Sequence, residues 1–182
     1  TNTPCTTIKV TLNQETGETS IWNDGDVVPI EMDPDEGVYN HTMIFGQLLT
    51  GSNYNDEEER IVAGRNGLGI KLCNVFSTKF TVEGVDPNNQ KSFSQTWTNN
   101  MRNVDKPIVK NKKGKGYTKV SWFPDFKLFG LDNYTDDIIG LYIRHIIDSA
   151  MISKIKVYLN DSLIPVKNLT QYSQLYDTPT QE

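Results

Sequence analysis

The segment Gly64–Lys71, which reads GRNGLGIK, restricts the fold and chemistry of this chain more than any other feature. It places three glycines and two cationic side chains within eight residues, directly before an apolar run made of Leu72, Cys73, Val75 and Phe76. Glycine permits positive φ and a close approach between backbone and ligand. A helix that begins here presents N–H groups without intrahelical partners and a partial positive charge. The segment therefore predicts an anion site, most naturally a site for a phosphate group.

Two common phosphate-binding motifs do not fit this segment. A P-loop requires G-x-x-x-x-G-K-[ST], but Ile70 follows the second glycine and Lys71 comes one residue late. A dinucleotide fingerprint requires G-x-G-x-x-G after a strand, whereas the order here is G-x-x-G-x-G with no clear strand before it. Taken alone, the segment leaves two alternatives open: a nucleotide site of another kind, or an ordinary turn before a helix.

Length and composition narrow the class of protein. A chain of 182 residues with a net charge of −5 is long enough for one domain with its own core. No apolar run approaches the roughly 20 residues that a membrane span requires. Cys5 and Cys73 lie far apart and favour reduced thiols in a cytosolic or nuclear protein. The acidic balance argues against strong DNA binding by this chain alone.

Periodicity predicts a mixture of strands and helices. Alternating apolar residues predict strands over 8–12, 19–23, 79–83, 93–97, 119–123 and 154–159, with a turn at Gly17 between the first two. Helical spacing predicts helices over 42–49, after the glycine segment, and over 138–150 behind an N-cap at Thr135. The expected fold is an α/β (α+β) two-layer sandwich, with a mixed sheet and helices on one face.

A basic segment over 110–116 contains four lysines, at 110, 112, 113 and 115. It is consistent with DNA contact or with a solvated hairpin loop, and the solvated loop is the favoured interpretation.

Several segments resemble the ATPase domain of eukaryotic-type DNA topoisomerase II. They are IFGQLLT at 44–50, SNY at 52–54, GRNG at 64–67 and LCNVFSTKF at 72–80, with further similarity at 22–25, 95–97, 117–120 and 157–160. These segments follow the family's order over nearly the whole chain. The family belongs to the GHKL group, so the resemblance implies a Bergerat ATP-binding fold.

The resemblance implies a set of ATP-binding residues. Asn23 matches the residue that faces the adenine amino group, and Gly25 matches the glycine against which the base lies. Ser52 and Asn53 match a run that contacts the ribose and α-phosphate, although Gly51 replaces the family's first serine. The glycine-rich lid around the triphosphate is matched by Gly64, Arg65, Asn66, Gly67, Leu68, Gly69 and Lys71.

The sequence departs from the family pattern in two ways. Val27 stands where the family has the last glycine of its first box, so its side chain is expected to crowd the nucleotide or shift the turn. The family's E-x-x-x-N-A-x-D helix, which supplies the general base and the Mg²⁺ ligand, does not occur in this chain. We therefore expect residues 1–177 to form a partial GHKL ATPase domain, with a frayed tail over 178–182. The N-terminal strap, that helix and the transducer would lie outside it.

The function implied by the resemblance is that of a part of an ATP-dependent type II DNA topoisomerase. Expected cofactors are ATP and Mg²⁺, expected partners are duplex DNA and a second subunit, and the expected location is the nucleus, with no membrane association. No catalytic or metal-binding residue is assigned to this chain, which alone should be inactive. The alternatives are a non-catalytic nucleotide-sensing or scaffold module with the same fold and, less favoured by 44–50 and 72–80, a chaperone-like GHKL ATPase.

Overall fold

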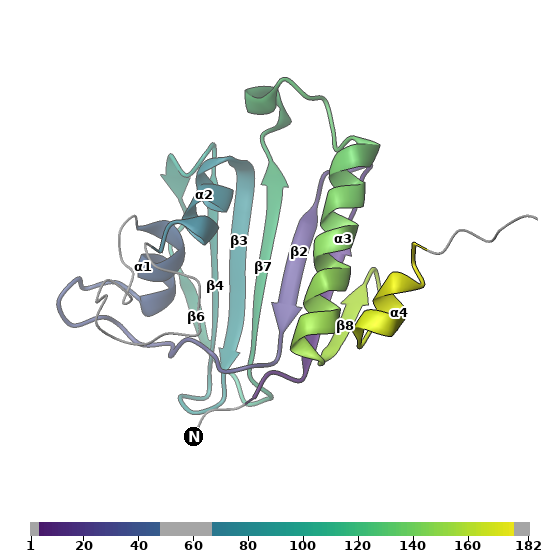
Figure 1. Ribbon diagram of the computed structural model, residues 1–182. Helices are drawn as coiled ribbons and strands as arrows, with labels where there is room; N and C mark the ends of the chain where they lie inside the picture. Colours follow the sequence, from purple (N-terminus) through teal and green to yellow (C-terminus); the bar gives the residue numbers. More distant parts are fainter. Residues whose placement is uncertain (1–3, 48–66, 177–182) are drawn as a thin grey trace, which may run out of the picture.

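The computed structural model describes residues 4–47 and 67–176, and its centre is a mixed sheet (Figure 1). The strand order is β5-β4-β3-β7-β2-β1-β8-β9, and β6 also pairs with β4. The bounds are β1 Thr7–Leu12, β2 Thr19–Asn23, β3 Ser77–Asp86, β4 Lys91–Thr98, β5 Asn103–Val104, β6 Ile108–Asn111, β7 Tyr117–Pro124, β8 Lys156–Leu159 and β9 Ser162–Leu163. Neighbouring strands are antiparallel except for the parallel pair β1 and β8.

Helices form the second layer of the molecule. They are α1 (Asn40–Gly46), α2 (Gly69–Val75), α3 (Asp136–Ser153) and α4 (Leu169–Ser173), with a 3-10 turn η1 at Phe126–Phe129. Figure 1 shows α1, α2 and α3 over the same face of the sheet, with α4 beside α3. The expected two-layer sandwich with a mixed sheet and helices on one face is therefore confirmed. Within residues 4–47 and 67–176, no helix has the length and apolar character that crossing a membrane requires.

The best-packed part of the core lies between α1 and the central strands. Its members are fully or nearly fully buried: Phe45, Phe80, Val82, Trp97 and Val120. Phe80 and Val82 of β3 have no exposed surface. Because burial of one large apolar side chain contributes about 1.5–3 kcal/mol, this cluster fixes α1 on the sheet.

Several predicted elements need correction at their ends. The first helix begins at Asn40, two residues before the predicted start, and Leu48 and Leu49 lie outside the described residues. Ile108–Asn111 pairs with β4, so Lys110 lies in a strand and not in the predicted basic loop. Lys154 ends α3 in the left-handed conformation, with φ of 58°, and does not begin β8.

Other predicted details agree with the structure. The Thr135 hydroxyl accepts a hydrogen bond from the Ile138 N–H at 3.3 Å, as expected of an N-cap. Gly17 has a φ of 75° in the turn between β1 and β2. Both cysteines are free thiols. The short elements β5, β6, β9, η1 and α4 were not predicted from the sequence.

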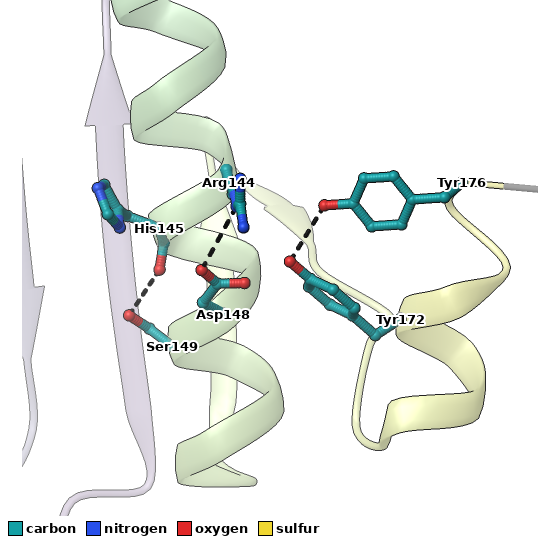
Figure 2. Close-up of polar contacts among 6 residues, drawn as sticks. All are labelled: Arg144, His145, Asp148, Ser149, Tyr172 and Tyr176. Carbon is teal, nitrogen blue, oxygen red and sulfur yellow. Dashed lines mark hydrogen bonds and ion pairs between the residues drawn. The ribbon is translucent and has the colours of Figure 1, made fainter.

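A cluster of polar side chains joins α4 to the outer side of α3 (Figure 2). The hydroxyls of Tyr172 and Tyr176 lie 3.1 Å apart, and Arg144 pairs with Asp148 at 4.0 Å. The hydrogen bond between the Tyr172 and Tyr176 hydroxyls, together with the nearby Asp148 carboxylate, raises the pKa of Tyr172 to about 12. Tyr172 therefore stays a neutral donor next to α3 at physiological pH.

The close contact between Gly46 and Trp97 makes the end of α1 sensitive to one methyl group. A Cβ on Gly46 would come within 2.8 Å of the Trp97 ring, whereas a Cβ on Gly140 of α3 would meet nothing within 4 Å. We expect Gly46→Ala to lower the free energy of unfolding by about 1–3 kcal/mol through overpacking. Gly140→Ala should raise it by up to about 1 kcal/mol, since alanine is the better helix former. Urea denaturation measures both changes, and equal effects of the two variants would contradict this packing.

Protonation of His41 should destabilise the fold. The imidazole is 1% exposed and stacks on Phe93 at 4.5 Å. Burial lowers the pKa of His41 from 6.5 to about 4, and the nearby Asp86 carboxylate offsets this only in part. The unfolded chain binds the proton first, so stability should fall as pH drops from about 6.5 to 4 and this contribution should level off below 4. The free energy of unfolding should fall by about 3 kcal/mol in total over this range.

Chemical denaturation between pH 4 and 7 tests this dependence. The His41→Phe variant should lose less stability than the wild type over that range, because it removes the titrating group. The matched variant at the exposed His145, His145→Gln, should keep the wild-type profile. Parallel profiles for the wild type and His41→Phe would show that another group carries the effect.

Candidate functional site

The segment predicted to hold the adenine begins where β2 ends. The Asn23 carbonyl oxygen Oδ1 accepts a hydrogen bond from the Gly25 N–H at 3.2 Å, which closes a tight turn. Gly25 is buried, and a Cβ on it would come within 3.0 Å of Cys5 Cβ. The space at Gly25 is therefore tight for any side chain, because Cys5, just before β1, packs against it.

Asp24 anchors this turn, a role that the sequence analysis did not assign. Its carboxylate accepts hydrogen bonds from the backbone N–H groups of Thr6 and Thr7, both at 2.8 Å, and from the Thr6 hydroxyl at 2.5 Å. Burial alone would raise the pKa of Asp24, but these hydrogen bonds outweigh it and lower the pKa to about 2. The ionised side chain thus ties the turn to the first strand at neutral pH. The sequence feature that could have predicted this anchor is an aspartate inside an N-D-G turn.

The end of the glycine segment enters α2 as predicted. Gly67 has a φ of 60°, in the left-handed region that glycine adopts without strain. Leu68 precedes the helix, and the Leu72 N–H donates to the Leu68 carbonyl at 2.9 Å. Lys71 lies in the first turn of α2. One loop-to-helix junction therefore contains Gly67, Leu68, Gly69 and Lys71.

Lys71 is the buried cation of this junction. Only 2% of the residue is exposed, and burial lowers the pKa of its ammonium group. A charge in such low-dielectric surroundings interacts with a nearby anion far more strongly than one in water. This environment suits the phosphate-binding role that the sequence implies for Lys71.

Hydrogen bonding fixes α2 in place behind this junction. The Asn74 side-chain amide donates to the Phe45 carbonyl of α1 at 3.0 Å, and Asn74 is completely buried. Since α1 is itself fixed by the core and Ile70 of α2 packs against the same cluster, core packing sets the position of Lys71.

An apolar cavity lies between α3 and the sheet. Its volume is about 390 Å³, and its walls come from β1, β2, β7, β8 and α3, including Val10, Ile21, Trp122, Tyr142 and Ile146. Ile21 remains 40% exposed although it lies on the same face of the sheet as α3. This part of the sheet is therefore covered less completely than the part beneath α1.

The structure describes only some of the predicted site residues, and these lie in two separate segments, the Asn23–Gly25 turn after β2 and the junction that begins α2. Asn23, Gly25, Gly67, Leu68, Gly69 and Lys71 are described, whereas Ser52, Asn53, Gly64, Arg65 and Asn66 lie outside the described residues. Over residues 4–47 and 67–176, no three His, Cys, Asp or Glu side chains are grouped in a way that would hold a metal ion. The described part of the predicted site thus consists of a tight turn after β2 and a buried lysine at the start of α2.

Known proteins are similar to this chain in sequence and in fold. The chain is 46% identical over 169 residues to DNA topoisomerase 2 of Penicillium chrysogenum, covering 93% of this chain and 11% of that protein. The solved ATPase region of Saccharomyces cerevisiae topoisomerase II matches with a TM-score of 0.89 and 40% identity, over 94% of this chain and 46% of that one. The chain belongs to the DNA topoisomerase II family.

Within this family, the chain corresponds to the ATPase region. DNA topoisomerase 2 of Acanthamoeba polyphaga mimivirus is also similar, at 42% identity over 172 residues, which cover 94% of this chain and 14% of that protein. The chain therefore spans 11–14% of the length of these two relatives. No family model matches it. The resemblance drawn from 44–50, 64–67 and 72–80 is confirmed.

The surroundings of Val27 bear on its expected effect on the nucleotide. A Cβ on Gly116 would lie 3.1 Å from Val27 Cγ1 and 3.1 Å from Pro87 Cδ, so the valine side chain is directed against this part of the protein. We expect Val27→Gly to lower the free energy of unfolding by about 1–2 kcal/mol through lost packing and added chain entropy. The affinity for a fluorescent ATP analogue should not change. Tighter binding by Val27→Gly would show instead that the side chain crowds the nucleotide.

Proposed function

We propose that this chain forms part of the ATP-binding site of an ATP-hydrolysing type II DNA topoisomerase. In the complete enzyme, ATP would close two subunits around DNA, and hydrolysis would reset them. The observation that carries the proposal is the buried Lys71 at the end of a glycine segment, within a chain that matches the topoisomerase II ATPase region over 94% of its length. DNA, a second subunit and a nuclear location follow from the family and belong to the proposal.

The proposed division of roles follows the described geometry. The Asn23–Gly25 turn would receive the adenine, because it is held rigidly against β1 by Asp24. Lys71 and the backbone of the glycine segment would neutralise the β- and γ-phosphates. A bound Mg²⁺ ion would neutralise further phosphate charge, and its ligand and the general base are expected from the E-x-x-x-N-A-x-D helix of the longer protein.

The apolar cavity beside α3 bears on where the helix with the general base would lie. Its walls are mostly aliphatic and aromatic, and Ile21 is 40% exposed there. A helix that packs its apolar face on this surface would bury it. We therefore propose that the helix carrying the general base covers this surface in the longer protein.

Titration with a fluorescent ATP analogue tests the assignment of Lys71. The Lys71→Met variant keeps most of the side-chain length without the charge, and its affinity should fall about 10- to 100-fold, as expected for a lost charge-assisted hydrogen bond. Lys79→Met, at an exposed position on β3, is the control and should bind like the wild type. Unchanged binding by Lys71→Met, with circular dichroism showing a folded protein, would remove Lys71 from the site.

The same titration separates the two candidate functions when it is repeated on the longer protein. Hydrolysis of bound ATP supports the topoisomerase ATPase. Tight binding without hydrolysis would favour the nucleotide-sensing module instead.

A further inference from the structure

The face of the sheet opposite the helices carries a row of charged and aromatic side chains. Side chains alternate between the two faces of a strand, so Val10 lies beneath α3 and Lys9 lies on the opposite face. Register then places Lys9 beside Trp22, Trp22 beside Lys119, and Lys119 beside Glu83. In the described part of the chain, the helices lie over the other face of these strands (Figure 1).

Two lysines of this face are held over aromatic rings. Lys9 Nζ lies 5.3 Å from the centroid of the Trp22 ring, and Lys112 Nζ lies 5.9 Å from that of Tyr117. The two rings stack on each other at 6.0 Å with an interplanar angle of 28°. Cation–π contacts of this kind restrict an ammonium group without neutralising its charge. The sheet therefore presents two preorganised positive charges.

The charge balance of this face is opposite to that of the whole chain. Two shallow hollows, of about 230 and 430 Å³, lie on either side of the aromatic pair. Their walls include four lysines, Lys9, Lys110, Lys112 and Lys119, and two carboxylates, Glu83 and Asp161. Glu83 is paired with Lys119 at 3.8 Å. A local excess of positive charge thus occurs on a chain whose net charge is −5.

We propose that this open sheet face, defined by Lys9, Trp22, Lys110, Lys112, Tyr117 and Lys119, binds the sugar–phosphate backbone of duplex DNA. The lysines run from β1 to β6 across β2, β7, β3 and β4, which is about 24 Å at the usual strand spacing. One turn of duplex is about 34 Å long, so the row faces about two-thirds of a turn. Ser94, half-buried in one hollow, adds a hydroxyl donor of the kind that contacts phosphates.

Other anionic partners fit this face less well. Single strands bind such surfaces by stacking bases on free aromatic faces, but here Trp22 and Tyr117 stack on each other and carry the two ammonium groups. Extended peptides add to the edge of a sheet rather than lie on its face. None of the residues that define this face is assigned to the proposed nucleotide site, so the proposal does not depend on ATP binding.

Fluorescence anisotropy with a labelled 20-base-pair duplex at 50 and 200 mM salt tests the proposal on the 182-residue chain. The wild type should bind in the weak, sequence-independent range of about 10⁻⁴–10⁻⁶ M. The double variant Lys9→Gln/Lys112→Gln should bind about tenfold more weakly at 50 mM salt. Its slope of log K against log salt should be smaller by about 2, because two phosphate contacts are lost. Lys9→Arg/Lys112→Arg should bind like the wild type.

The matched control is Lys127→Gln/Lys154→Gln, which removes the same charge from η1 and from the end of α3. It should keep the wild-type slope. The proposal is overturned if the control weakens binding as much as Lys9→Gln/Lys112→Gln, or if the wild type shows no duplex binding at 50 mM salt. It is equally overturned if a single strand of the same length, or polyglutamate, binds more tightly than the duplex and depends on the same two lysines.

Discussion

The fold depends on β3 pairing along most of its length with β4 on one side and β7 on the other. β3 pairs with β4 from Lys79 to Asp86 and with β7 from Ser77 to Val85. Phe80 and Val82, within the paired stretch, are completely buried. Because side chains alternate along β3, one face must meet the helices while the other faces outward. The positions of α1, α2 and the glycine junction all follow from that choice of face.

The candidate site consists of rigid parts at the ends of these elements. Asp24 ties the turn after β2 to the start of β1, and Asn74 ties α2 to α1. Each contact fixes a backbone segment that carries residues proposed for the nucleotide site. Preorganisation of this kind lets a few polar groups orient a ligand without a large ordering cost on binding.

The sequence predicted the elements whose pattern is local. The β1–β2 hairpin and α3 have clear alternation or helical spacing, and Thr135 caps α3 as expected. The short strands β5 and β9 contain two residues each, too few for any periodicity, and they exist because β4 and β8 offer free edges. Lys110 was assigned to a loop since charged residues dominate its neighbourhood, but pairing with Ser92 holds it in β6. Spacing and resemblance proposed Lys71 for the site, whereas its burial and the anchoring by Asp24 depend on tertiary contacts that no local pattern encodes.

The parallel pairing of β1 with β8 has a consequence for synthesis on the ribosome. Val10 pairs with Leu159, and the Leu12 N–H donates to Asn160 at 2.8 Å across 148 positions of the chain. Contacts this distant in sequence form late, because the intervening loop must first be closed. The β1–β2 hairpin therefore emerges long before β8 is translated, and β1 cannot form its parallel pairs until β8 has also left the ribosome.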